Sequence, residues 1–253
     1  MKTKIYGIDG NKKSALDLPI IFDEEIRPDI IKRAVEAEQA NRRQPYGPAK
    51  RAGMRHATES LGKGQGLSRV QRYTQHGNRA AESPPNVGGR RAHPPKPEKD
   101  RSKKVNKKER AKARRSALAA TSEKNLVVGR GHKFDEEIDF PIIVEKDIEE
   151  IKKTQDAIEF LKKIGVYADI ERAKKGKKIR AGKGKLRGRK YKKPVSLLVV
   201  LSKDSKGIEA FSNLAGISVK SPDEVSVEDL APGGEMGRLT IFSENAIQKM
   251  EGW

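Results

Sequence analysis

A stretch from residue 45 to residue 100 constrains this chain most, because it lacks the side chains that a hydrophobic core needs. It holds eight glycines and seven prolines, and its larger apolar residues are Tyr46, Met54, Leu61, Leu67, Val70, Tyr73 and Val87. A structureless segment of this length is unusual inside a compact domain. We interpret it either as a disordered linker or as an arm that folds against a partner, and its many arginines favour the arm.

Charge is distributed unevenly along the chain. Residues 42–104 hold 16 lysines and arginines against 4 acids, residues 105–116 hold 6 against 1, and residues 172–193 hold 13 against none. The rest holds 20 basic and 30 acidic residues, so it is acidic although the whole chain has a formal net charge of +20. Solvated charge runs without a partner are one reading. Segregated positive charge is more typical of a surface that binds phosphate, which favours a polyanionic partner.

Outside these tracts, short apolar runs alternate with helical spacing, which indicates an α/β domain. Strands are expected near residues 4–8, 126–128, 140–144, 166–170, 195–201, 217–219 and 238–242, with a further apolar run at 18–22, and helices near 28–42, 106–122, 148–164, 205–214 and 243–250. The run VSLLVVL at 195–201 is typical of a parallel strand that helices cover on both faces. We predict one doubly wound globular domain from residues 1–44 and 101–253, interrupted by a basic loop (172–193) and by the arm (45–100).

Two helix starts carry a capping pattern, in which a polar side chain bonds the first turn and a glutamate three residues later bonds back. Asn106 pairs with Glu109 in one, and Asp147 with Glu150 in the other. The second helix is expected to end at Gly165 and to bury an apolar stripe. The stripe consists of Ile148, Ile151, Ile158, Leu161 and Ile164.

The motifs of nucleotide-dependent enzymes are missing. The glycine patterns at 62–66 (GKGQG) and 182–188 (GKGKLRG) do not stand between an expected strand and an expected helix, and they lack the serine or threonine that would hold magnesium. The chain has no cysteine, which excludes disulfides, thiolate catalysis and cysteine-based zinc sites. An RNA-modifying or RNA-processing enzyme would need a cofactor loop or paired catalytic acids. We therefore expect no enzyme activity, no cofactor and no small-molecule substrate.

Histidines and clustered acids are weak candidates for metal or acid–base chemistry. The histidines are His56, His76, His93 and His132, and the acids are Asp135, Glu136, Glu137 and Asp139. The histidines show no metal-ligand spacing, so contact with phosphate or sugar is favoured over zinc binding or general-base work. A magnesium site is one alternative for the acids, but solvation of a strand edge is favoured. No metal is expected.

Arginines, glycines and a few aromatic rings alternate along the arm, which favours structured RNA as the partner. Glycine lets the backbone approach phosphates, guanidinium groups grip phosphates with two hydrogen bonds, and flat rings stack on unpaired bases. A flexible tail that binds any polyanion and an architectural DNA-binding protein remain the alternatives. The candidate RNA-binding residues are Arg42, Arg43, Tyr46, Arg51, Arg55, Lys63, Arg69, Arg72, Tyr73, Arg79, Arg90, Arg91, His93, Lys96, Arg101, Arg114, Arg115, Lys183, Lys185, Arg187, Arg189, Lys190 and Tyr191.

Membrane insertion and secretion are not expected. No apolar run reaches the roughly 18 residues that a membrane-spanning helix needs. The N-terminal sequence MKTKIYGIDGNKK has no apolar signal core. A cytoplasmic location is therefore expected.

Six phrases together resemble the archaeal and eukaryotic branch of the large-subunit ribosomal protein four family. They are RRQPYGPAKRAGMRH, GGRRAHPPKPEKDRS, RRSALAATS, RGH, GKGKLRGRKYKKP and DLAPGGEMGRLTIF. Any one phrase alone is weak, but the resemblance extends in order over nearly all 253 residues. The long C-terminal tail of the eukaryotic members has no counterpart after Trp253, which favours the archaeal type.

The resemblance implies a Rossmann-like three-layer α/β domain with a mostly parallel sheet, on the outer side of the large ribosomal subunit. It implies a structural role in which the chain binds large-subunit ribosomal RNA and supports subunit assembly. The arm would thread this RNA toward the nascent-peptide exit tunnel, where its tip and large-subunit protein twenty-two narrow the passage. By order along the arm, the tip is expected near residues 63–72 (KGQGLSRVQR).

Overall fold

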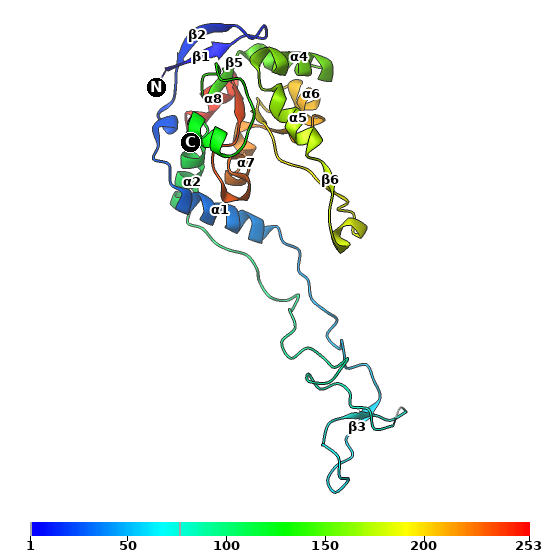
Figure 1. Cartoon of the computed structure of the whole chain (residues 1–253). Coiled ribbons are helices and arrows are strands. Elements are labelled where there is room, and N and C mark those ends of the chain that lie inside the picture. Colours follow the sequence, from blue (N-terminus) through cyan, green and yellow to red (C-terminus); the bar gives the residue numbers. More distant parts are fainter. Residues whose placement is uncertain (1, 76) are drawn as a thin grey trace. The chain divides into compact units, whose positions relative to one another are not determined.

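The structure is a computed structural model that describes residues 2–75 and 77–253. The chain divides into two compact units (Figure 1). The larger unit, called the body, contains residues 1–39 and 103–253, and the smaller unit contains residues 40–102. His76, one of the four histidines considered above, lies outside the described residues.

The body is built on a six-stranded sheet in the order β2-β1-β5-β10-β8-β9. Its strands are β1 (Lys2–Tyr6), β2 (Lys12–Asp17), β5 (Ile142–Val144), β8 (Leu198–Val200), β9 (Ser218–Lys220) and β10 (Thr240–Ser243). All neighbouring pairs are parallel except β1 and β2, which are antiparallel. The prediction of a mostly parallel sheet is confirmed.

Both faces of this sheet are buried, because side chains alternate between two apolar layers. Along β8, Leu198 belongs to one core cluster and Val199 to the other. Ile241 of β10 lies in register with Ile142 on one side and Val199 on the other, so the layers continue from strand to strand. A strand enclosed in this way is apolar along its whole length, which explains the run at 195–201.

Four helices cover one face of the sheet (Figure 1). They are α1 (Pro28–Asn41), α2 (Lys107–Ala119), α7 (Val227–Leu230) and α8 (Glu244–Met250). Most of the apolar run at 18–22 forms the 3-10 helix η1 (Ile20–Asp23), which contributes Phe22 to the core on this face. Its ring meets Phe242 of β10 edge to face, with 5.8 Å between ring centroids.

The opposite face is covered by α3 (Lys124–Gly129), α4 (Thr154–Ile164), α5 (Tyr167–Lys175) and α6 (Gly207–Ser212). Phe160 of α4 meets Phe211 of α6 edge to face, with 6.4 Å between ring centroids. The body is thus a three-layer α/β structure. Numbered along the chain, its five parallel strands follow the order 1-2-5-3-4, which differs from the usual Rossmann order 3-2-1-4-5-6.

Two expected strands are helices, so these predictions were wrong. Residues 126–128 lie in α3 and residues 166–170 lie mostly in α5. Short apolar runs do not distinguish a strand from one buried helix turn. Val166, Ile170 and Ala173 are all buried, and their spacing of four and three is helical, but only the first two lay in the apolar run.

Helix starts differ from the predicted capping pattern. The side chain of Asn106 makes no capping hydrogen bond, and Glu109 instead pairs with Arg33 at 3.2 Å. The helix expected to begin at Asp147 begins at Thr154, because residues 146–150 form the 3-10 helix η2 (Lys146–Glu150). Its predicted end is confirmed, since Gly165 has a left-handed φ of 85°.

The helix expected at 243–250 is confirmed together with its cap. The hydroxyl of Ser243 accepts a hydrogen bond from the backbone N–H of Ala246. A capping box at α7, in which Ser226 and Asp229 bond each other's backbone N–H groups, was not predicted. The strand β2 was not predicted either.

The smaller unit has little regular structure, as its composition predicts. Two short antiparallel strands, β3 (Thr58–Glu59) and β4 (Arg72–Tyr73), form its only sheet among the described residues. In the same described part, Ala81 is the sole buried hydrophobic residue. Backbone turns therefore shape this unit more than apolar packing does.

The basic loop (172–193) begins inside a helix, because residues 172–175 form the last turn of α5. Beyond the helix, β6 (Lys178–Ile179) and β7 (Tyr191–Lys192) pair antiparallel, with the 3-10 helix η3 (Lys183–Leu186) between them. The remaining 3-10 helices of the body are η4 (Pro222–Glu224) and η5 (Pro232–Gly234). Within the described residues, no helix is long and apolar enough to cross a membrane.

Candidate RNA-binding surfaces

The two legs of the arm lie side by side in the smaller unit. A Cβ atom at Gly47 would stand 2.6 Å from the carbonyl oxygen of Pro95, and one at Gly53 would stand 2.7 Å from the Cα atom of Arg90. Both glycines are therefore required by close backbone approach. This approach brings the sequence-predicted residues Arg90 and Arg91 of one leg beside Lys50 and Gly53 of the other, where all four line one groove.

A stacked pair joins the legs. The guanidinium carbon of Arg101 lies 4.5 Å from the ring centroid of Tyr46, and its Nη2 donates to the carbonyl oxygen of Tyr46 at 3.0 Å. Lys50 and Glu98 add an exposed ion pair at 3.2 Å. The structure thus brings Tyr46 and Arg101 together. This contact could not be predicted from the sequence, because the two residues are 55 positions apart.

Arg72, the last residue of the predicted tip, and Tyr73 form β4. Arg72 donates to the carbonyl oxygens of Ser68 and Asn78. The ring of Tyr73 packs edge to face on that of His56, with 5.0 Å between centroids. These contacts hold both residues in place within the arm.

The tip itself is open. Gly62, Gly64 and Gly66 have φ values of 73°, 80° and 65°, and added Cβ atoms there would meet nothing within 4 Å. Such φ values favour glycine whatever the surrounding space. Lys63 and Arg69 are exposed beside these turns.

Most of the other arm candidates are exposed. They are Arg42, Arg43, Arg51, Arg55, Arg79, Arg90, Arg91 and His93. Lys96 is exposed as well, and its carbonyl oxygen accepts a hydrogen bond from Arg101 at 3.5 Å. Because these side chains are exposed, they can contact a polyanion without loss of core packing.

The basic loop presents a second surface. Its candidates Lys183, Lys185, Arg187, Arg189 and Lys190 are exposed. The ring of Tyr191 has two ammonium groups near it, Lys177 at 4.3 Å and Lys190 at 5.6 Å from its centroid. Because residues 177–193 contain no acid, this surface carries an uncompensated positive potential.

Helix α2 holds its two candidate arginines against the body. The guanidinium carbon of Arg114 lies 3.2 Å from the ring centroid of Trp253, and its Nη2 donates to the carbonyl oxygen of Pro222 at 3.2 Å. Burial lowers the pKa of Arg114, which Asp223 opposes. Arg115 lies 3.9 Å from the carboxylate of Glu24. Trp253 has no motif around it, so the sequence contains no signal for its contact with Arg114.

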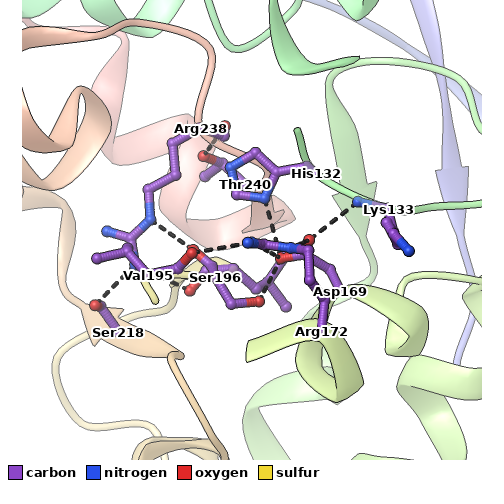
Figure 2. A network of polar contacts seen from close by, with 10 residues as sticks. His132, Lys133, Asp169, Arg172, Val195, Ser196, Ser218, Arg238 and Thr240 are labelled. Carbon is purple, nitrogen blue, oxygen red and sulfur yellow. Dashed lines mark hydrogen bonds and ion pairs between the residues drawn. The ribbon is translucent and has the colours of Figure 1, made fainter. Parts of the chain in front are cut away.

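His132 is placed differently from the prediction of a phosphate or sugar contact, which was wrong for this residue. It is buried, and its Nδ1 lies 3.0 Å from Oδ2 of Asp169 (Figure 2). Asp169 is also buried and accepts hydrogen bonds from the backbone N–H of Lys133, from Arg172 and from the hydroxyl of Ser196. The network surrounds a carboxylate that cannot reach solvent.

The protonation of Asp169 follows from these contacts. Burial alone raises the pKa of its carboxyl group, but the hydrogen bonds from His132, Arg172 and Ser196 outweigh burial and hold the pKa well below its ordinary value. The carboxylate is therefore ionised throughout the physiological pH range.

Arg238 extends the same network (Figure 2). Its Nε donates to the carbonyl oxygen of Ser196 at 2.8 Å, and its Nη1 donates to that of Asp229 at 2.7 Å. Its Nη2 bonds the carbonyl oxygen of Leu197 at 3.2 Å and the hydroxyl of Ser218 at 2.8 Å. Burial lowers the pKa of Arg238 to about 10, so it stays charged at neutral pH. The network ties together the amino ends of β8, β9 and β10.

Glu149 lies at the opposite ends of the same strands, the carboxyl ends of β8 and β10. Its carboxylate accepts hydrogen bonds from the backbone N–H of Ser202 at 3.0 Å, from the hydroxyl of Ser243 at 2.6 Å and from the amide of Asn245 at 3.1 Å. Ser202 and Ser243 stand at the carboxyl ends of β8 and β10. Open α/β sheets bind nucleotides just outside the carboxyl ends of their strands. In this protein the donor groups at those ends are already hydrogen-bonded to the carboxylate of Glu149.

Two of the acidic residues near β5, Glu136 and Asp139, are contacted by lysines of the body. The carboxylate of Asp139 lies 2.7 Å from Nζ of Lys12. The side chain of Lys124 donates to the carbonyl oxygen of Glu136. Among the described residues, no group of three or more histidines and acids is arranged to hold a metal ion.

Comparison with known proteins places this arrangement in a family. The model of the ribosomal protein L4/L1 family matches residues 16–253. The chain is 48% identical over 250 residues to a protein of Halobacterium salinarum, which covers 99% of both chains. It is 47% identical over 253 residues to a protein of Archaeoglobus fulgidus, covering 100% of this chain and 99% of that one. A protein of Methanocaldococcus jannaschii is 49% identical over 251 residues, covering 99% and 98%.

All three relatives are named large ribosomal subunit protein uL4. The similarity includes the arm and the basic loop as well as the α/β body, since it spans nearly the whole chain. The chain belongs to the ribosomal protein L4/L1 family.

Proposed function

We propose that this chain is a structural constituent of the large ribosomal subunit in the cytoplasm and binds large-subunit ribosomal RNA. One observation carries the proposal: the smaller unit has a single buried hydrophobic residue among its described residues, while residues 42–104 hold 16 basic side chains. A segment of this kind gains too little from its own packing to offset the entropy of ordering. Contacts with RNA phosphates supply the missing stabilisation.

In this proposal the arm, the basic loop and the arginines of α2 all contact the ribosomal RNA. The arm inserts between RNA segments, where its glycine-rich turns fit narrow spaces. The basic loop and α2 anchor the body on the RNA surface and support assembly of the subunit. The remaining charged residues of the body are mainly acidic, which restricts RNA contact to these surfaces.

We assign the tip of the arm, residues 63–72, to the nascent-peptide exit tunnel, beside large-subunit protein twenty-two. Three open glycine turns and exposed side chains support this assignment. Deleting residues 63–72 and measuring nascent-chain passage in ribosomes that contain the variant tests this assignment separately from RNA binding.

An RNA-modifying or RNA-processing enzyme is not favoured. The family is structural, and Glu149 engages the polar groups at the edge where such a sheet would bind a nucleotide cofactor. The buried Asp169 and His132 are enclosed within the body and meet no open surface. No reaction is assigned to the chain.

Binding of the full chain to three nucleic acids tests the proposal. Transcribed fragments of large-subunit ribosomal RNA, fragments of small-subunit ribosomal RNA of equal length, and duplex DNA would compete for the protein at physiological salt. We expect the large-subunit fragments to bind most tightly. Equal affinity for all three would identify a general polyanion binder, and a preference for duplex DNA would identify an architectural DNA-binding protein.

A further inference from the structure

A pocket of about 350 Å³ lies on the body where helix α2, the 3-10 helix η4 and the segment after α8 meet. Its lining residues are Ala111, Arg114, Arg115, Asp223, Gly252 and Trp253. The volume is large enough for a nucleobase. Neither the family match nor the names of the relatives assigns a ligand to this pocket.

The pocket contains a preformed stacking surface. Trp253 packs against the core cluster on its face of the sheet, and its backbone N–H donates to the carbonyl oxygen of Met250 at 3.1 Å. The guanidinium group of Arg114 lies against the indole and is held by the carbonyl oxygen of Pro222. A flat cation on a flat ring, both fixed by the body, is a surface on which another flat ring stacks without further ordering.

The polar groups of the pocket are mixed in charge. Arg114 and Arg115 contribute two cations and Asp223 contributes a carboxylate. The Nε atoms of Arg114 and Arg115 are buried and have no hydrogen-bond partner among the described residues. The lining of the pocket therefore combines two guanidinium groups, which attract an anion, with one carboxylate, which accepts a hydrogen bond from a donor group.

We propose that this pocket receives an unpaired base of large-subunit ribosomal RNA, which stacks on the Arg114–Trp253 pair. Arg115 donates to the neighbouring phosphate, and Asp223 accepts a hydrogen bond from an amino or imino group of the base. The inference rests on the proposed function and adds a specific site to it. Bases have a π-face, donor groups and a nearby phosphate, which matches the stack, the carboxylate and the second arginine. An acidic protein segment fits less well, because its carboxylate side chains have no flat ring to stack on the Arg114–Trp253 pair.

The chain contains one tryptophan, so its fluorescence reports on this pocket alone. The full chain would be titrated with transcribed large-subunit ribosomal RNA fragments while Trp253 emission and its quenching by acrylamide are recorded. We expect saturable quenching of emission by RNA and a two-fold or greater loss of acrylamide access. Inorganic phosphate at matched ionic strength should produce neither effect, because it has no ring to stack.

A variant at the lining of the pocket tests the site by affinity. A Cβ atom at Gly252, one of the lining residues, would meet nothing within 4 Å, and this residue is not among those with positive φ, so Gly252→Leu adds a bulky side chain at the pocket without crowding the fold. Gly129→Leu, at an exposed glycine of α3 with equally open space, is the matched control. Loss of one stacked base at about 1–3 kcal/mol corresponds to a roughly 5- to 150-fold weaker complex. We expect this loss for Gly252→Leu alone.

Salt dependence separates the site from the rest of the RNA contacts. Stacking releases few counterions, so Gly252→Leu should lower affinity at every salt concentration and leave the slope of log affinity against log salt nearly unchanged.

If RNA binds with wild-type strength to Gly252→Leu and Trp253 stays open to acrylamide, the base pocket is refuted while the proposed function stands. If the wild-type chain binds no ribosomal RNA, both fail. Protection of Trp253 only when other ribosomal proteins are added would refute the base and identify a protein partner. If Gly252→Leu does not fold, the acrylamide measurement on the wild-type chain tests the base pocket by itself.

Discussion

Replacing Asp169 by asparagine should destabilise the body severely, because this buried carboxylate accepts hydrogen bonds from His132, Lys133, Arg172 and Ser196. The asparagine keeps the size of the side chain but removes its charge, and its NH₂ group faces donors. Breaking a buried ion pair by removing one partner costs about 3–5 kcal/mol. For a body of this size, each kcal/mol shifts Tm by roughly 2–4 °C, so Tm should fall by roughly 6–20 °C.

The assay is urea and thermal unfolding followed by far-ultraviolet circular dichroism. Glu171→Gln is the matched control, since Glu171 lies on the same helix and forms an exposed pair with Lys175 at 3.5 Å. Its change should stay within about 0.5 kcal/mol. A loss below about 1 kcal/mol for Asp169→Asn would refute the reasoning, because the network would then contribute little to stability.

The same residue predicts how stability depends on pH. The pKa of Asp169 is lowered in the folded protein, so its contribution is complete above the unfolded pKa of about 4 and is lost as pH falls through that value toward the folded pKa. The unfolding free energy of the wild-type protein should therefore fall more steeply below about pH 5 than that of Asp169→Asn. Parallel pH curves for the two proteins would contradict this assignment.

Three further predictions concern RNA binding and the arm. Limited trypsin digestion of the free protein should cut within residues 45–100 first, because this stretch has little apolar packing; a resistant arm in the absence of RNA would contradict this. With roughly six phosphate contacts, doubling the salt concentration should weaken RNA binding roughly ten-fold or more, and a nearly flat dependence would exclude phosphate contacts as the main source of affinity. Changing Arg187, Arg189 and Lys190 together to alanine should weaken RNA binding while Tm stays nearly constant, since these side chains are exposed; a large fall in Tm would place them in the fold's own packing.

The sequence predicted the layers of the body well where hydrophobic patterns were long. The run at 195–201 predicted a strand buried on both faces, and Leu198 and Val199 indeed belong to opposite core clusters. Segregated charge separated the arm and the basic loop from the acidic remainder. These features depend on composition over many residues, so a single sequence is enough to detect them.

Shorter patterns misled the prediction. The short apolar run at 126–128 predicts a buried strand, but three residues contain too little periodicity to distinguish a strand from a helix turn, and Val127 is buried on helix α3. Asp147 and Glu150 have the spacing of a capping box, yet residues 146–150 form a separate 3-10 turn before α4. Local spacing therefore did not determine where a helix begins.

Contacts between distant residues lay beyond sequence reasoning. His132 and Asp169 are separated by 37 positions, and Arg238 reaches the same network from the strand that inserts in the middle of the sheet. The stacking of Arg114 on Trp253 likewise joins the middle of the chain to residue 253. Each contact depends on the strand order, which periodicity does not specify.

The role of the tip is tested most directly by deleting residues 63–72 and following the protein into large ribosomal subunits. The deleted stretch carries only Lys63, Arg69 and Arg72 of the 16 basic residues at 42–104, so most of the phosphate contacts should survive. We predict that the variant cosediments with large subunits in high salt as the wild-type chain does, and that the purified ribosomes show altered stalling of nascent chains. A variant that fails to enter subunits would show that these residues anchor the protein, and unchanged nascent-chain passage in subunits that contain it would contradict the placement of the tip at the tunnel.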